Sequence, residues 1–150
     1  LKDDTGRFLS GFTSSNGNYV AGKSGQRYTI FIRNHSPGRI EAVVTVDGLD
    51  VIDGRAGSLS KRGYLIEPHG ELEVDGWRTS TTQVASFRFG SVSNSYAAKK
   101  HGQTRNVGVI GVALFHAAGD SPRFWSKHNN NVTKRHTADP FPQKFASPPN

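Results

Sequence analysis

Apolar and polar residues alternate along two neighbouring segments of the chain, "QRYTIFIRN" and "RIEAVVTV". An alternation with a period of two is typical of a β-strand that buries one of its faces. The apolar residues of these two faces are Tyr28, Ile30, Ile32, Ile40, Ala42, Val44 and Val46. Pro37 and Gly38 lie between the segments and suit the two central positions of a type II turn. The pattern therefore predicts two strands that pair as a hairpin.

Shorter segments predict further strands. They are "NYVAG" near the N-terminus and then "GYLIEP", "ELEVDGW", "QVASFRFG" and "NVGVIGVALF". The last segment is apolar on both faces, which predicts a central strand with both faces covered. "SNSYAAKK" favours a helical turn, with Ser93 or Ser95 as its cap and Lys99 and Lys100 at its C-terminal end. Several short strands separated by turn residues predict an all-β fold, an antiparallel β-sandwich of the immunoglobulin-like or jelly-roll type.

The character of the chain changes after His116. Residues 117–150 are rich in Pro and Asn and show no hydrophobic periodicity, so this part has no core of its own. We therefore expect a β-sandwich domain at 1–116 and an extended C-terminal arm at 117–150. The arm carries four large aromatic residues, Phe124, Trp125, Phe141 and Phe145. Two interpretations stay open: the aromatic residues fold back over the sheet of their own domain, or they anchor in a neighbouring subunit.

A group of carboxylates in "VTVDGLDVIDG" raises the question of a cation-binding loop. Asp47, Asp50 and Asp53 repeat every three residues, so successive side chains of an extended chain point to opposite faces. In a calcium loop of the EF-hand type that began at Asp47, the third and fifth positions would be apolar. We interpret Asp47-Gly48 and Asp53-Gly54 as two turns. A weak calcium site at the three aspartates is the alternative.

The chain is basic, with 19 Lys and Arg residues against 12 Asp and Glu and a net charge of +7. Such a charge favours contact with nucleic acid, anionic glycans or lipid headgroups without choosing among them. The candidate polyanion-binding residues are Lys61, Arg62, Arg78, Arg88, Lys99 and Lys100. In the alternative interpretation, Tyr64 and Trp77 pack inside the domain and the arginines are solvated. No recognition-helix or single-strand-binding signature is present, which argues against nucleic acid.

Two residue types are missing from the chain. Without Cys, disulfides and thiolate metal sites are excluded. The absence of Met, even at position 1, is typical of a processed or trimmed chain, and removal of a signal peptide is the commonest natural reason. No apolar run approaches the ~18 residues that a membrane-spanning helix needs. These observations favour a secreted or cell-envelope protein.

Six segments, taken together, resemble a family of small uncharacterised exported proteins of Gram-negative bacteria. The segments are "VDGLDVIDG" (46–54), "KRGYLIEP" (61–68), "DGWRTS" (75–80), "ASFRFG" (85–90), "SYAAK" (95–99) and "NVGVIGVALF" (106–115). The resemblance covers residues 26–115 and leaves both ends of the chain outside it. It implies export and a β-sandwich, and it implies no activity and no site residues.

Motifs for catalysis are weak. "GDSP" at 119–122 is similar to the Gly-Asp-Ser motif of one esterase class, but Ser121 opens a Pro-rich segment instead of following a strand early in an α/β domain. His128 and His136 lie eight residues apart without a third metal ligand nearby. Residues 131–133 fit the N-glycosylation pattern, which matters only in a eukaryotic protein.

From these observations we expect a non-enzymatic structural or assembly subunit of the bacterial cell envelope or exterior. It would need no cofactor or metal, and it would self-associate through the arm at 117–150. The alternative is an extracellular binding module for an acidic glycan or another polyanion.

Overall fold

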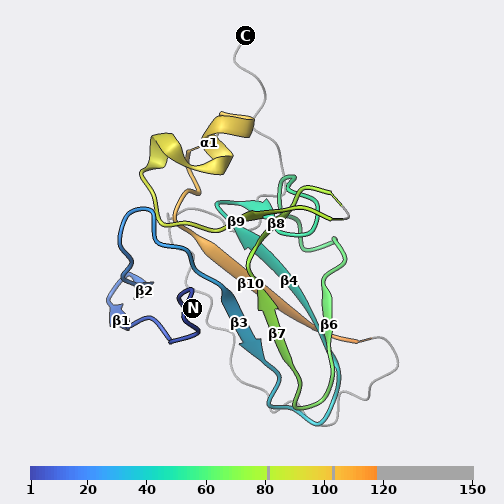
Figure 1. Cartoon of the computed structure of the whole chain (residues 1–150). Helices are drawn as coiled ribbons and strands as arrows, with labels where there is room; N and C mark the ends of the chain where they lie inside the picture. The colour runs from blue at the N-terminus through green and yellow to red at the C-terminus, as the bar shows by residue number, and fades with distance from the viewer. Residues whose placement is uncertain (81, 103, 118–150) are drawn as a thin grey trace.

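The computed structural model describes residues 1–80, 82–102 and 104–117, and this part is an all-β protein whose strands pair antiparallel (Figure 1). The strands are β1 (Gly11–Ser14), β2 (Gly17–Val20), β3 (Ile30–Arg33), β4 (Ile40–Val46), β5 (Leu49–Asp50), β6 (Tyr64–Ile66), β7 (Glu71–Val74), β8 (Gly76–Arg78), β9 (Val84–Ser86) and β10 (Ile110–His116). The helical elements are the 3-10 helix η1 (Val92–Asn94) and the α-helix α1 (Tyr96–His101). Within these ranges no helix has the length and apolar character that a membrane crossing requires.

The strand β4 is the centre of the largest sheet. It pairs along its full length with β10, from Val46 opposite Ile110 to Ile40 opposite His116. Its other edge pairs with β6 at one end and with β5 at the other. Every residue from Ala42 to Val46 is buried, so both faces of the strand are covered, as β-branched side chains in a central strand favour.

The predicted hairpin between the first two regular strands is wrong. β3 pairs with β7, and in Figure 1 this pair lies in front of the sheet that contains β4 and β10. The reason is the loop after β3, where Gly38 does not have the positive φ that a type II turn requires. Instead, the buried side chain of Asn34 donates hydrogen bonds to the carbonyl oxygens of Gly38 (2.7 Å) and Glu67 (3.0 Å). Asn34 therefore ties the loop to the chain after β6 and directs β4 into a different sheet.

One hydrophobic core joins the sheets. Its buried members are Tyr28, Ile30, Ile40, Ala42, Val44, Val46, Leu49, Val51, Ile66, Val74, Trp77, Phe87 and Ala97. Ile30 and Val74 come from the β3–β7 pair, whereas Ile40 and Val44 come from β4, so side chains of two sheets meet in this cluster. The alternating faces predicted from the sequence supply six of these thirteen residues.

The prediction that "NVGVIGVALF" forms a central, doubly covered strand is also wrong for the residues that the structure describes. Within them β10 pairs only with β4, and it is an edge strand. Three of its alternate side chains are substantially exposed: Ile110 (36%), Val112 (41%) and Leu114 (48%). Periodicity reports how apolar a strand is, but it does not report which strand receives two neighbours, and here β4 takes that place.

Two local predictions are confirmed. Asp47 and Gly48 have φ values of 56° and 78°, the positive pair of a type I′ turn, and they place Val46 opposite Leu49. The second turn closes where the Gly54 N–H donates to the Asp50 carbonyl oxygen at 2.8 Å. The helical turn is confirmed as α1, and of its two candidate caps it is Ser95 whose hydroxyl accepts the N–H of Ala98, at 3.1 Å.

Candidate functional site

An open groove of about 1270 Å³ lies between β3, the start of β10 and the segment from β9 to α1. Ile30 and Ile32 of β3 line one side, and Ile110 and Val112 of β10 line the other. Because β10 is an edge strand of one sheet and β3 belongs to another, the groove follows the place where the two sheets separate. Its apolar walls are positioned to bind an apolar group of another molecule or of another part of the chain.

Aromatic rings form the end of the groove nearest α1. The ring of Tyr28 lies 4.7 Å from that of Phe89, and the indole of Trp77 stacks on Tyr96 at 4.7 Å, both between ring centroids. Phe87 lies behind them, with its centroid 4.8 Å from Trp77 and in an edge-to-face arrangement. Such packing makes this wall rigid, because each ring is held by at least one other.

The buried indole of Trp77 lacks a hydrogen-bond acceptor. Trp77 is only 5% exposed and lines the groove, and its Nε1 has no partner in the part of the chain that the structure describes. A buried donor without an acceptor costs about 1–3 kcal/mol, so most buried indole N–H groups are paired. The Nε1 atom is itself buried, so this unsatisfied donor lies beneath the surface of the groove wall.

Two ionisable side chains also line the groove, the carboxyl of Asp47 and the phenol of Tyr28. Burial raises the pKa of Asp47 above its ordinary value, although the N–H of Gly108 donates to its carboxylate at 2.7 Å. Burial and the nearby charge of Asp47 raise the pKa of Tyr28 above its ordinary range. Tyr28 is therefore a neutral hydroxyl at physiological pH, suited to hydrogen bonding and packing and not to nucleophilic attack.

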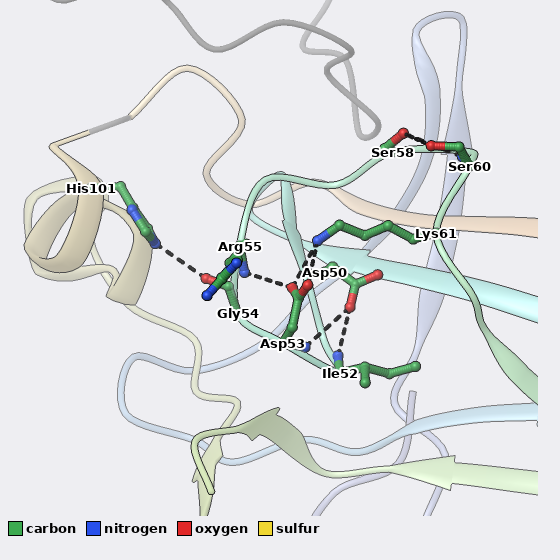
Figure 2. A network of polar contacts seen from close by, with 9 residues as sticks. All are labelled: Asp50, Ile52, Asp53, Gly54, Arg55, Ser58, Ser60, Lys61 and His101. Carbon is green, nitrogen blue, oxygen red and sulfur yellow. Dashed lines mark hydrogen bonds and ion pairs between the residues drawn. The ribbon is translucent and has the colours of Figure 1, made fainter.

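The other polar cluster is the turn at residues 50–55, shown in Figure 2. The Oδ1 atom of Asp50 accepts the backbone N–H groups of Ile52 (2.8 Å) and Asp53 (3.3 Å). The carboxylate of Asp53 binds the ammonium of Lys61 at 2.7 Å. Burial raises the pKa of Asp53, but the hydrogen bond from Lys61 and that from the N–H of Arg55 outweigh burial and leave this pKa below its ordinary value.

These contacts bear on the alternative of a calcium site. Asp47 binds Gly108, Asp50 closes its own turn, and Asp53 is neutralised by Lys61. Among the residues that the structure describes, no group of three or more His, Asp or Glu side chains is placed to hold a metal ion. The three carboxylates hold turns, in agreement with the interpretation of this stretch as a folding element.

The six candidate polyanion-binding residues have different local surroundings. Arg88 and Lys99 line the groove, whereas Lys61 is engaged with Asp53. The ammonium of Lys100 donates to the hydroxyl of Tyr96 at 2.8 Å. Arg62 and Arg78 lie outside the groove lining, and Arg78 is exposed. Trp77 is buried, as the alternative interpretation of these aromatic residues predicted, and Tyr64 is half-buried.

The remaining candidate residues lie outside the described ranges. They are the arm aromatics Phe124, Trp125, Phe141 and Phe145, together with Ser121, His128, His136 and the 131–133 sequon.

No protein-family model matches the chain, and comparison with curated proteins and with solved structures finds no match. The groove itself was missed by the sequence analysis, although the two apolar faces of "NVGVIGVALF" were its signal.

Replacing Asp50 should change how stability depends on pH. Asp50 is 2% exposed, and its pKa is raised by burial, against the lowering effect of its hydrogen bonds and of Lys61. The pKa of Asp in the unfolded chain is about 3.8, and a group whose pKa is higher in the folded state contributes its full stabilisation of the fold below that pH. This contribution to the free energy of unfolding is lost as the pH rises through the folded-state pKa. Asp50→Asn should therefore flatten the fall in the free energy of unfolding above that pH, measured by urea titrations at several pH values.

Asp53→Asn is the matched control, because the pKa of Asp53 is shifted in the opposite direction. Its stabilising contribution is present above the unfolded-state value and lost as the pH falls through the lowered pKa. The Asp53→Asn variant should lose stability at neutral pH and lose little in acid. Parallel pH profiles for wild type and Asp50→Asn would contradict the assignment.

Proposed function

We propose that this protein is a non-enzymatic structural or assembly subunit of the bacterial cell envelope or exterior. In this proposal the two sheets form a β-sandwich, and the chain self-associates through the arm at 117–150. The resemblance to exported proteins of Gram-negative bacteria supports the location. The apolar groove, and not an arrangement of acid, base and nucleophile, supports a role in binding and assembly.

The observation that carries the proposal is the set of exposed apolar side chains on the edge strand β10. Ile110, Val112, Leu114 and Phe115 are each between 36% and 48% exposed, on a strand whose outer edge is unpaired within the described residues. Monomeric proteins avoid a long apolar edge strand, because it pairs with other chains. An arm that follows β10 directly and carries four large aromatic residues matches such a surface.

The test is the size distribution of the full chain in solution. The double variant Trp125→Ala with Phe141→Ala should shift the protein from oligomers to monomers in light scattering, with the dissociation constant raised at least about a hundredfold, since an aromatic anchor contributes about 2 kcal/mol or more. The control is Phe12→Ala, which removes an exposed aromatic residue (57%) of the β1–β2 hairpin. A wild-type protein that is monomeric at all concentrations would refute self-association.

Binding of an acidic glycan or another polyanion remains the alternative function. Two of its six candidate cations, Lys61 and Lys100, are engaged by Asp53 and Tyr96. Salt separates the two functions, because polyanion binding weakens steeply as ionic strength rises and aromatic-anchored assembly does not. Light scattering across a salt series tests the assembly, and the same series with an added acidic glycan tests polyanion binding.

A further inference from the structure

Within the residues that the structure describes, the strand β3 has one edge without a partner strand. Towards β7, its ladder continues past Arg33 to Asn34, whose N–H donates to the Gly70 carbonyl at 2.9 Å. On the opposite edge, Thr29 exchanges two 2.9 Å backbone hydrogen bonds with Lys2. Backbone groups alternate between edges, so those of Phe31 and Arg33 point to the same edge as those of Thr29. Within the described residues, the backbone groups of Phe31 and Arg33 have no partner there.

The groove opens beside this edge. Ile30, Phe31 and Ile32 all line it, and the ring of Phe31 also packs on that of Phe8, with centroids 5.5 Å apart. At about 1270 Å³ the groove exceeds the roughly 300–1,000 Å³ of a typical small-molecule site. An apolar trough next to a free strand edge is the arrangement that receives an added peptide strand, with hydrogen bonds along the edge and pockets for alternate side chains.

One segment of the arm has the pattern that such a strand requires. In "PFPQKFA" (140–146), the odd-numbered positions hold Phe141, Gln143 and Phe145. The even-numbered positions hold Pro140, Pro142, Lys144 and Ala146. In an extended chain the odd side chains share one face, and the odd N–H groups share one edge. The two prolines, which cannot donate, then fall on the outer edge, where Pro and Lys are the usual residues.

We infer that residues 140–146 bind in the groove as a strand added to the free edge of β3, with Phe141 and Phe145 inserted between β3 and β10. This inference rests on the proposed function of the arm. Residue 141 follows Ala117 by 24 positions, and at about 3.3 Å per residue such a length reaches the groove of its own molecule or of a neighbour.

The absence of Cys from the chain allows a direct test in the full-length protein. Val112→Cys places a thiol in the groove, and Leu59→Cys places one elsewhere at a similar exposure (41% and 43%). Adding Phe141→Ala with Phe145→Ala should raise the alkylation rate of the thiol at position 112 about tenfold, because the tethered segment no longer covers this thiol. The alkylation rate of the thiol at position 59 should not change.

Two proline substitutions test which edge of the added strand faces β3. Gln143→Pro removes an N–H directed at β3 and should raise the alkylation rate at position 112 as the double alanine variant does. Lys144→Pro removes an N–H directed outward and should leave the rate at its wild-type value. Equal rates in all these backgrounds would refute the inference.

Cross-linking separates this inference from the proposed function. Val112→Cys with Gln143→Cys should form a disulfide under mild oxidation, and Leu59→Cys with Gln143→Cys should not. Covalent dimers and larger species on a non-reducing gel support both the groove and the assembly. A disulfide within a single chain supports the groove and refutes assembly through the arm. Oligomers without preferential cross-linking refute the groove and leave the assembly standing.

Discussion

Phe87→Ala is expected to lower the free energy of unfolding by about 4 kcal/mol, because removal of a large aromatic side chain from a packed core typically costs 3–5 kcal/mol. Phe87 is 0% exposed and joins the two halves of the aromatic wall. It stacks on Tyr28 with centroids 5.4 Å apart and meets Trp77 edge to face at 4.8 Å. Alanine leaves a cavity between these rings, and chemical denaturation followed by Trp fluorescence measures the loss.

Phe12→Ala serves as the control for this loss. Phe12 also stacks on an aromatic partner, Tyr19, at 5.4 Å, but it is 57% exposed. Its removal should cost no more than about 1 kcal/mol, as is usual for a surface aromatic pair. If the two variants lost equal stability, the aromatic wall would not be part of the folding core.

Gly63→Ala is the second large destabilisation that we expect, of about 3 kcal/mol, near the upper end of typical overpacking costs. A Cβ atom at position 63 would lie 2.2 Å from the carbonyl oxygen of Ala42 and 2.4 Å from its carbonyl carbon. Both are backbone atoms of the central strand β4, so no rotamer change relieves the clash. The N–H of Gly63 also donates to the Glu41 carboxylate at 2.6 Å, which holds the two segments together.

Gly90→Ala is the matched control, since a Cβ atom there meets no atom within 4 Å and its φ is ordinary. It should be neutral or slightly stabilising, because alanine reduces the conformational freedom of the unfolded chain. Thermal unfolding of the two variants side by side measures the difference. If Gly63→Ala had the same melting temperature as the wild type, residue 63 and the strand β4 would not be in such close contact.

The turns and the cap were predictable because their causes lie within a few residues. The pair Asp47-Gly48 favours the positive φ values of a tight hairpin turn, and Ser95 caps the helix that begins at the next residue. The alternation from Ile40 to Val46 likewise marks a strand with a buried face. These local preferences also place Trp77 and Tyr28 among the aromatic residues available for a core.

The partners of the strands were not predictable in the same way. In the loop between β3 and β4, Asn34 binds carbonyl groups of Gly38 and Glu67, and Glu67 is distant in the sequence. The edge position of β10 depends on how β5 and β6 share the other edge of β4. A period of two describes one strand, whereas pairing is a choice among several apolar strands.

The sequence by itself determined the all-β class, the two Asp-Gly turns and many of the residues able to form a core, because these follow from backbone preferences and apolar periodicity over short distances. Only the tertiary structure decided that β3 pairs with β7, that β10 lies at an edge, and that an apolar groove opens between them. The physical reason is that backbone hydrogen-bonding groups are the same in every strand. The order of strands is therefore set by contacts between segments far apart in the chain, and those contacts shape the groove.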